Sequence, residues 1–382
     1  MSPALFAVAL LVIGMGAGFG LGRFVWPTRG SGSARTSTTL PTFGFPFGGS
    51  TFPFGSGSSG ATSSAKGSPS DPAAIAAKVD PALVDVDTTL GYQSEMAAGT
   101  GIVLSSNGEI LTNNHVIDGA TNVSVTDIGN GQVYSATVVG YDRARDVAVL
   151  QVNGASGLKV ASFAPSAKVR VGEPVVGIGN AGGAGGTPSV AGGSVTAINQ
   201  SITATEHDGG NPENLTGLIE VNSDIQAGDS GGPLVNAAGK VIGLDTAAST
   251  GFSLETPGTQ GYAIPIGPAL AVAKQIESGR SSANVHVGPT AFLGVEVLPA
   301  PSGSSSPGAL VHAVVAGSPA AKAGLMAGDS ITALGGVPVG SPSELVWLMQ
   351  LYRPGVRVQV NWRNAAGGQQ NAVVQLVTGP AA

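Results

Sequence analysis

The sequence predicts a mainly β protein, in which an all-β sandwich or pair of barrels precedes a small α+β unit. Two observations carry this prediction. Short alternating strands with frequent turns run from about Pro72 to Gly279, which is typical of an all-β sandwich or barrel pair. Helix start signals and one alternating strand then share the segment from about Gly288 to Thr378.

An uncharged apolar stretch at residues 4–22 predicts an N-terminal helix about as long as a bilayer is thick. Basic residues follow it, at Arg23, Arg29 and Arg35, and none precedes it. The positive-inside rule reads this as a cytoplasmic C-terminal side, which conflicts with an exported protein. We therefore expect a start codon placed too far downstream, with a basic leader missing. Residues 1–29 are expected to be a signal peptide or an uncleaved membrane anchor in the cell envelope.

Glycine, serine, threonine and proline dominate residues 30–71 and are interrupted by single phenylalanines. This composition cannot bury enough apolar surface to form a core. We expect a disordered linker that acts as a flexible tether.

Charge and cysteine content exclude several classes of function. Charged residues make up only 10% of the chain, and the net charge is -6. Phosphate binding needs clustered positive charge, so no nucleic acid partner is expected. The chain has no cysteine, which excludes disulfides, thiolate metal sites and a cysteine nucleophile. No cofactor and no metal are expected, and core packing alone must hold the all-β part together.

The all-β part is assigned to residues 72–280. Within it, strands are predicted at Glu109–Thr112 and Val147–Val152, where apolar residues recur as a strand requires. A helix is predicted over Pro268–Ser278, because proline lies just inside its start and Gly279 lies just past its end.

The second unit is assigned to residues 281–382. Ser341-Pro342-Ser343-Glu344 is a capping box, and apolar residues at helical spacing follow it. A shorter helix is predicted to open at Ser318-Pro319 and to end at Gly324. A strand is predicted where apolar residues alternate with polar ones, at Val356, Val358, Val360 and Trp362.

The most specific chemical signal is the segment Gly228-Asp229-Ser230-Gly231-Gly232-Pro233. Attack of a serine on a carbonyl creates an oxyanion, which needs backbone N–H donors aimed at it from a tight turn. Glycines on both sides of Ser230 allow that turn without Cβ clashes. We expect Ser230 to be a nucleophile, with the N–H groups of Gly228 and Ser230 as its oxyanion hole.

A serine nucleophile needs an imidazole to take its proton and a carboxylate to orient that imidazole. Of the four histidines, His115 is the one that follows a strand-like run at a turn where its ring can face a cleft. Asp142 and Asp146 compete for the third position. Asp146 is preferred because it immediately precedes the strand at Val147, whose packed backbone can orient it. The predicted triad is His115, Asp146 and Ser230.

One further motif is rejected. The segment at residues 177–182 matches the dinucleotide-binding fingerprint, but that fingerprint requires a helix directly after its glycines. Glycine, proline and serine follow instead, so no nucleotide site is expected.

Taken together, these segments resemble the HtrA-type trypsin-like serine proteases. The likeness is carried by residues 99–103, 112–116, 146–150, 179–180, 228–234 and 261–265. The C-terminal unit resembles the PDZ domain of this family, with residues 292–295 in place of its carboxylate-binding loop and further matches at 318–325 and 328–329. The resemblance covers roughly residues 72–380 and is greatest to the mycobacterial secreted PepA-type proteases.

The resemblance implies a chymotrypsin-like double β-barrel that hydrolyses unfolded or damaged proteins outside the cytoplasm, in trimers or larger homo-oligomers. It also implies a PDZ domain that binds C-terminal peptides by strand addition and regulates proteolysis. Leu293, Gly294 and Val295 would line that site, and a helix at residues 345–352 would form its wall. Two alternatives stay open: a PDZ-centred chaperone or binding module with secondary proteolysis, and acyl transfer or ester hydrolysis on small substrates.

Two residues depart from the common pattern of the family. Asp229 stands where many relatives have asparagine, and the sequence gives no partner for its carboxylate. Asp224 lies where a small residue is common, at a position that can form the floor of the primary specificity (S1) pocket. A carboxylate there would favour Lys or Arg substrates, whereas a solvent-facing Asp224 on a shifted loop is the preferred alternative.

Overall fold

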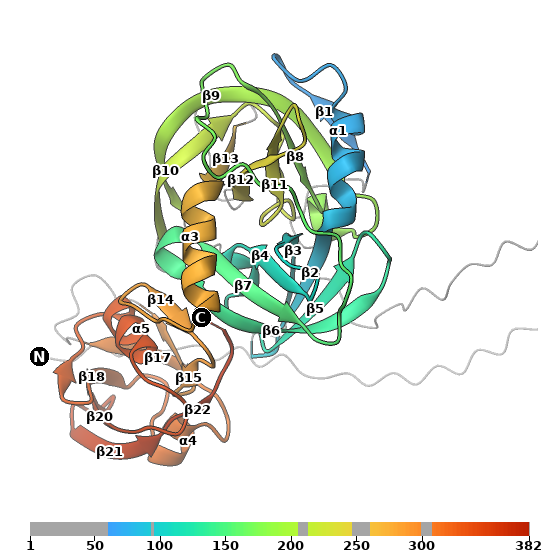
Figure 1. The fold of residues 1–382 in the computed structure, drawn as a ribbon. Coiled ribbons are helices and arrows are strands. Elements are labelled where there is room, and N and C mark those ends of the chain that lie inside the picture. Colours follow the sequence, from blue (N-terminus) through green and yellow to red (C-terminus); the bar gives the residue numbers. More distant parts are fainter. Residues whose placement is uncertain (1–59, 93–94, 205–212, 247–259, 299–307, 382) are drawn as a thin grey trace, which may run out of the picture. The chain divides into compact units, whose positions relative to one another are not determined.

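The structure is a computed structural model, and it describes residues 60–92, 95–204, 213–246, 260–298 and 308–381 (Figure 1). The predicted helix at residues 4–22 and most of the predicted linker lie outside the described residues. Among the residues that the structure describes, no helix has the length and apolar character needed to cross a membrane.

The first part of the fold is a closed barrel of six antiparallel strands. Its order is β6-β5-β2-β3-β4-β7, and pairing of β6 with β7 closes it. Burial alternates along β5, where Val123 and Val125 point into the core, as expected for a strand with one face inside. The strands are β2 (Leu83–Leu90), β3 (Glu95–Val103), β4 (Glu109–Thr112), β5 (Asn122–Asp127), β6 (Val133–Asp142) and β7 (Val147–Val152).

A second six-stranded barrel follows in the chain. Its order is β9-β10-β13-β12-β11-β8, and it is closed by pairing of β9 with β8. Its strands are β8 (Pro174–Gly179), β9 (Ser189–Ala204), β10 (Glu213–Val221), β11 (Pro233–Asn236), β12 (Val241–Thr246) and β13 (Gly261–Pro265). The predicted strands at 109–112 and 147–152 are confirmed as β4 and β7, and the predicted double barrel is confirmed.

Helix α3 (Ile266–Glu277) packs against strands of both barrels, including β6, β7, β12 and β13 (Figure 1). It begins two residues before the predicted start at Pro268, and Gly279 follows it with a φ of 71°. The buried face of α3 and inward residues of both barrels form one continuous apolar cluster. That shared core fixes the two barrels together without disulfides.

The predicted boundaries differ from the structure at both ends of the barrels. β1 (Thr62–Ser64) pairs with β9, and Asp71 caps helix α1 (Pro72–Val79), so residues 60–71 are ordered where a disordered linker was expected. β14 (Val285–Val287) pairs with β6, so the barrel sheet continues past residue 280. In both cases the exposed edge of a strand offers backbone partners that composition does not reveal.

The C-terminal unit is an α+β fold with its own apolar core. Its sheet runs β16-β17-β18-β20-β21, with β19 beside β18, and β15 pairs separately with β22. The elements are β15 (Ala291–Phe292), β16 (Val295–Leu298), β17 (Ala309–Val314), α4 (Pro319–Ala323), β18 (Ser330–Leu334), β19 (Val337–Pro338), α5 (Pro342–Gln350), β20 (Arg357–Arg363), β21 (Gln369–Gln375) and β22 (Val377–Thr378).

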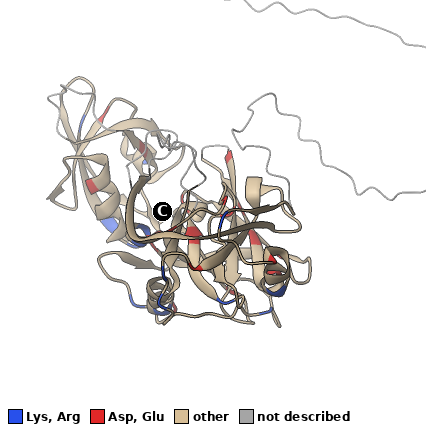
Figure 2. Ribbon diagram, turned by 90° about the horizontal axis from the view of Figure 1, so that it is seen from above, with Lys and Arg blue, Asp and Glu red and all other residues tan. Residues whose placement is uncertain are grey.

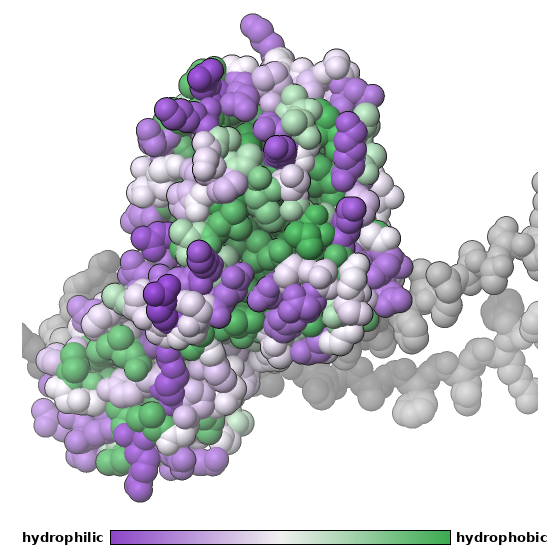
Figure 3. Space-filling view, in the orientation of Figure 1, coloured by the Kyte–Doolittle hydropathy of each residue, from purple (hydrophilic) through white to green (hydrophobic). Residues whose placement is uncertain are grey.

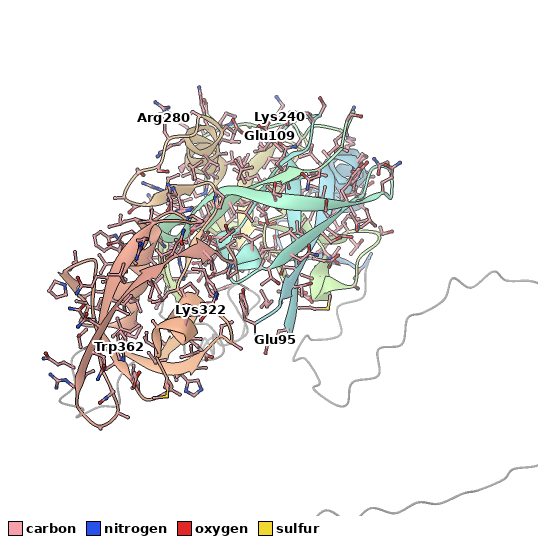
Figure 4. The ribbon with its side chains drawn as sticks, turned by 90° about the horizontal axis from the view of Figure 1, so that it is seen from below. Glu95, Glu109, Lys240, Arg280, Lys322 and Trp362 are labelled. Atoms are coloured by element: carbon pink, nitrogen blue, oxygen red, sulfur yellow. The ribbon has the colours of Figure 1, made fainter. Side chains whose placement is uncertain are left out.

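Both predicted helices of this unit are confirmed, with one difference in the capping box. The Ser341 hydroxyl accepts from the Glu344 N–H at 3.2 Å, as a capping box requires. The Glu344 carboxylate accepts instead from the N–H of Gly340, one residue further out. Trp362 is buried on β20, and Lys322 lies on α4 (Figure 4).

Charged side chains are scattered among uncharged ones over the described part of the chain (Figure 2). On the face drawn in Figure 3, hydrophobic residues gather over the middle of the barrels and hydrophilic residues surround them. The predicted triad residues His115, Asp146 and Ser230 therefore belong to a protein whose side chains are mostly uncharged.

Candidate active site

The register of β4 and β7 brings His115 and Asp146 together. Thr112, the last residue of β4, lies opposite Ala148 near the start of β7. Because the two strands are antiparallel, the chain after Thr112 faces the chain before Ala148. His115 lies there on the short helix α2 (Asn114–Ile117), and Asp146 is the residue just before β7.

The Asp146 carboxylate holds the imidazole of His115 in place. Its Oδ2 lies 2.9 Å from His115 Nδ1, and its Oδ1 accepts the His115 backbone N–H at 3.0 Å. Thr246, at the end of β12, donates its hydroxyl to the same Oδ2 at 3.1 Å. Asn113 donates its side-chain amide to the Asp146 carbonyl at 2.9 Å. With Asp146 accepting at Nδ1, Nε2 is the basic nitrogen of the ring.

Asp146 adopts a backbone conformation that is uncommon for its type. Its φ is 52°, in the left-handed region, where it ends the 3-10 helix η2 (Arg143–Arg145). The competing Asp142 caps the start of η2 and pairs with Arg145, with its Oδ2 2.6 Å from Nη1. The geometry thus separates the two candidates, because Asp142 binds an arginine and Asp146 binds the histidine.

Thr100 on β3 fastens the turn that carries Ser230. Its hydroxyl donates to the Gly228 carbonyl at 2.8 Å and accepts the Asn180 N–H at 2.9 Å. Its backbone N–H donates to the Ser230 carbonyl at 2.8 Å. Thr112 in turn donates its hydroxyl to the Thr100 carbonyl at 2.7 Å. The nucleophile turn of the second barrel is therefore held by β3 of the first barrel.

Glycine is required at two positions where the turn and the first barrel meet. Gly228 has a φ of 96°, and a Cβ there would collide with the Asn180 carbonyl. A Cβ on Gly99 would lie 2.7 Å from the Val116 side chain and 3.1 Å from the Ser230 carbonyl oxygen. Gly99 thus lies between the Ser230 carbonyl and the side chain of Val116, the residue that follows His115, so the turn that carries Ser230 is close to the segment that carries His115.

The carboxyl group of Asp229 has partners that the sequence did not reveal. Its Oδ1 lies 2.7 Å from the Ser189 hydroxyl on β9, and its Oδ2 accepts the Gln226 N–H at 2.9 Å. Burial raises the pKa of Asp229 to about 6, against the smaller opposing effects of these hydrogen bonds. The Asp229 carboxyl group therefore stabilises the Gln226–Ser230 turn through these two hydrogen bonds.

Asp224 is partly exposed and accepts a hydrogen bond from the Gln226 side chain at 2.9 Å. Ile225, the next residue, packs between Gly177 on β8 and Gly261 on β13. A pocket floor formed by Asp224 stays a prediction.

The predicted carboxylate-binding loop lines an apolar groove in the C-terminal unit. The groove has a volume of about 190 Å³, and the Phe292–Val295 loop, β16 and α5 contribute to its walls, together with Asp118, Gly119, Pro380 and Ala381. Leu293 is buried, while Gly294 has a φ of 86° and would collide with the Ser318 side chain if it carried a Cβ. The apolar wall from α5 is formed by Leu345, Val346 and Met349.

Comparison with known proteins identifies both parts of the chain. The model for the trypsin-like peptidase domain matches residues 99–244, and the model for the PDZ domain matches residues 291–371. Serine protease PepD of Mycobacterium tuberculosis is 35% identical over 347 residues, which cover 84% of this chain and 71% of PepD. The chain belongs to the HtrA-type trypsin-like serine proteases.

Other relatives of this HtrA-type protease are longer or more distant. The periplasmic pH-dependent serine endoprotease DegQ of Escherichia coli is 35% identical over 266 residues, covering 69% of this chain and 55% of DegQ. The chain thus spans about half the length of that relative. A solved serine endoprotease from Yersinia pestis is 27% identical with a TM-score of 0.45, covering 81% of this chain and 98% of its own.

Sequence reasoning missed the residues that support the predicted triad. Thr100, Asn113, Ser189 and Thr246 all act through hydrogen bonds to segments distant in the chain. Threonine, serine and asparagine are common at strand ends, so their type alone carries no signal. The α-helix that the nucleotide fingerprint requires does not follow residues 177–182: the chain forms the short 3-10 helix η3 (Ala181–Gly183) at the end of the motif and then continues to strand β9.

Proposed function

We propose that this chain is an extracytoplasmic serine endopeptidase in which His115, Asp146 and Ser230 form the catalytic triad. The observation that carries the proposal is the Asp146 carboxylate, which binds both Nδ1 and the backbone N–H of His115 beside the Ser230 turn. This arrangement suits proton transfer from the Ser230 hydroxyl to His115 Nε2.

In the proposed reaction, Ser230 Oγ attacks the scissile carbonyl while His115 takes its proton. Asp146 stabilises the imidazolium that forms and keeps the ring oriented. The N–H groups of Gly228 and Ser230 stabilise the oxyanion, from a turn held by the Thr100 hydroxyl. His115 then returns the proton to the leaving amine, and water hydrolyses the acyl-enzyme by the same route.

The PDZ domain is proposed to bind C-terminal peptides and to regulate proteolysis. Leu293, Gly294 and Val295 would offer backbone N–H groups to the terminal carboxylate, and the apolar wall of α5 would take the last side chain. Substrates are proposed to be unfolded or damaged proteins, which expose such ends. Assembly into homo-oligomers and attachment to the membrane through residues 4–22 are further parts of the proposal.

The S1 preference is proposed from the residues just before the nucleophile. Ile225 packs close to two glycines of the second barrel and favours a small apolar floor, whereas Asp224 would favour Lys or Arg. Cleavage of matched peptides with Val or Arg at the scissile position distinguishes the two, since a basic pocket requires a preference for Arg.

Reaction with a fluorophosphonate label tests the proposed function. We expect the full chain to be labelled and to hydrolyse unfolded casein, and Ser230→Ala to lose both. Ser223→Ala serves as the control, because Ser223 is also a buried serine of the same segment. Retention of casein hydrolysis by Ser230→Ala would refute the assignment.

A further inference from the structure

Asp245, on β12, is a fully buried acid that the proposed mechanism does not use. It is 0% exposed, and neither of its carboxyl oxygens has a hydrogen-bond partner of ordinary geometry. A Cβ on Gly177 would lie 3.1 Å from its Oδ2, so the carboxyl group sits against the backbone of β8. A negative charge on this carboxyl group would be poorly stabilised, because burial removes its hydrating water and no well-formed hydrogen bond replaces that water.

The backbone of Asp245 is tied directly to the nucleophile turn. Its carbonyl accepts the Gly231 N–H at 2.9 Å, and its N–H donates to the Gly232 carbonyl at 2.7 Å. The next residue, Thr246, donates its hydroxyl to the Asp146 carboxylate. Displacement of Asp245 would therefore disturb the Ser230 turn and the support of His115 at the same time.

The groups facing Asp245 are mainly acidic or uncharged. β8 and β11 contribute no titratable side chain. Lys274 and Glu277 are on the exposed side of α3. Burial raises the pKa of Asp245 well above its usual range, and the nearby Asp229 raises it further, while the Ile178 N–H opposes this weakly. The other titratable groups on elements packed against Asp245 are Asp224, Asp229 and Tyr262.

We propose that Asp245 keeps its proton in the working enzyme, and that this neutral carboxyl group is a positioning element for the turn that carries Ser230. Ionisation of Asp245 would place a second negative charge beside that of Asp229 in the protein interior. The unfavourable energy of the two charges could fall only if β12 moved or water entered. Movement of β12 would disturb the nucleophile turn, because the backbone of Asp245 is hydrogen-bonded to Gly231 and Gly232. The inference rests on the proposed triad, and it predicts a loss of activity on the alkaline side that does not come from His115.

The test compares pH profiles of kcat/KM from pH 5 to 10 for the full chain and for Asp245→Asn, which is a neutral isostere. We expect the two to agree within about threefold at pH 6–7 and to share the acid limb set by His115. Above neutrality the wild type should fall by roughly tenfold per pH unit once Asp245 ionises, while Asp245→Asn keeps its plateau. The difference should appear in kcat rather than KM, because the turn acts on the nucleophile.

Asp229→Asn is expected to shift the alkaline limb of the pH profile, in the direction opposite to the effect of Asp245→Asn. It removes the negative charge that helps Asp245 to keep its proton, so the alkaline limb should move to lower pH. Asp80→Asn is the control: Asp80 is a half-buried acid with one buried oxygen that has no hydrogen-bond partner and a pKa raised by burial to about 6, but it lies on the 3-10 helix η1 (Asp80–Ala82), outside the site. Its profile should coincide with that of the wild type.

Coincident profiles of the wild type and Asp245→Asn up to pH 10 would overturn the inference, as would a loss of more than tenfold in Asp245→Asn at pH 7. If Asp245→Asn fails to fold, the pH profile of Asp229→Asn is the deciding measurement. An alkaline limb at the same pH as in the wild type, or at higher pH, then overturns the inference. Failure of the proposed function is seen separately, as a wild type that neither hydrolyses substrate nor takes a serine label.

Discussion

Replacement of Thr100 by valine tests how the first barrel controls the nucleophile turn. Valine keeps the branched shape of threonine but removes its hydroxyl. That hydroxyl satisfies two backbone groups in the interior, the Gly228 carbonyl and the Asn180 N–H. A buried backbone group left without a partner costs about 1–3 kcal/mol, so Thr100→Val is expected to lower the free energy of unfolding by roughly 2–6 kcal/mol.

The same change should reduce kcat, because Gly228 carries one of the proposed oxyanion donors. Loss of a complete donor costs about 10²–10³ in kcat in other enzymes, and a donor that is only less well held should cost less, on the order of 10–10². KM should change little. Thr100→Ser keeps the hydroxyl and is the matched control, with stability and kcat near the wild type.

Stability is best followed by urea unfolding with far-ultraviolet circular dichroism. The three tryptophans, Trp26, Trp347 and Trp362, all lie outside residues 72–280, so their fluorescence does not report on the barrels. The reasoning is refuted if Thr100→Val unfolds within about 0.5 kcal/mol of the wild type, or if the valine and serine variants have the same kcat.

Three further predictions follow from single contacts. Asp146→Asn should lower kcat by roughly 10⁴, while Asp142→Asn, which disturbs only an arginine pair at the turn, should lower it less than tenfold in the same peptide assay. Burial raises the pKa of Asp85 from 3.8 to about 6, so its contribution to stability is present at low pH and is lost as the pH rises from about 4 to 6. Asp85→Asn should therefore raise the free energy of unfolding at pH 7.5 by about 1–2 kcal/mol, after allowance for partial solvent screening, and leave it unchanged near pH 4 in urea titrations. Gly294→Ala should weaken binding of a peptide with a free hydrophobic C-terminus by tenfold or more in fluorescence anisotropy, because its Cβ would collide with Ser318; Gly317→Ala, with a φ of 74° but open space around it, should bind normally.

Local patterns determined the elements that depend on neighbours in the sequence. β4 and β7 occur where they were predicted, and α4 and α5 begin at their serine caps. Asp146 was preferred over Asp142 because it immediately precedes the strand at Val147. The structure adds the contacts that distinguish the two residues, since Asp142 binds Arg145 and Asp146 binds His115.

Errors arose where a segment gains its order from a distant partner. Residues 60–71 have the composition of a linker, yet β1 lies on β9 and Asp71 caps α1. β14 likewise extends the first barrel beyond the predicted boundary. Composition measures whether a segment can form a core of its own, and it does not register an open strand edge elsewhere in the fold.

The sequence by itself determined the order of the chemical groups, the cysteine-free frame and the succession of two kinds of unit. These follow from residue type and short-range periodicity, which need no folded context. Tertiary structure decided what surrounds the nucleophile: Thr100 from the first barrel on the turn, Ser189 on Asp229, and Asp245 buried nearby without a well-formed hydrogen bond. Hydrogen bonding and desolvation depend on which distant residues meet, so these groups acquire their roles only when the two barrels close around them.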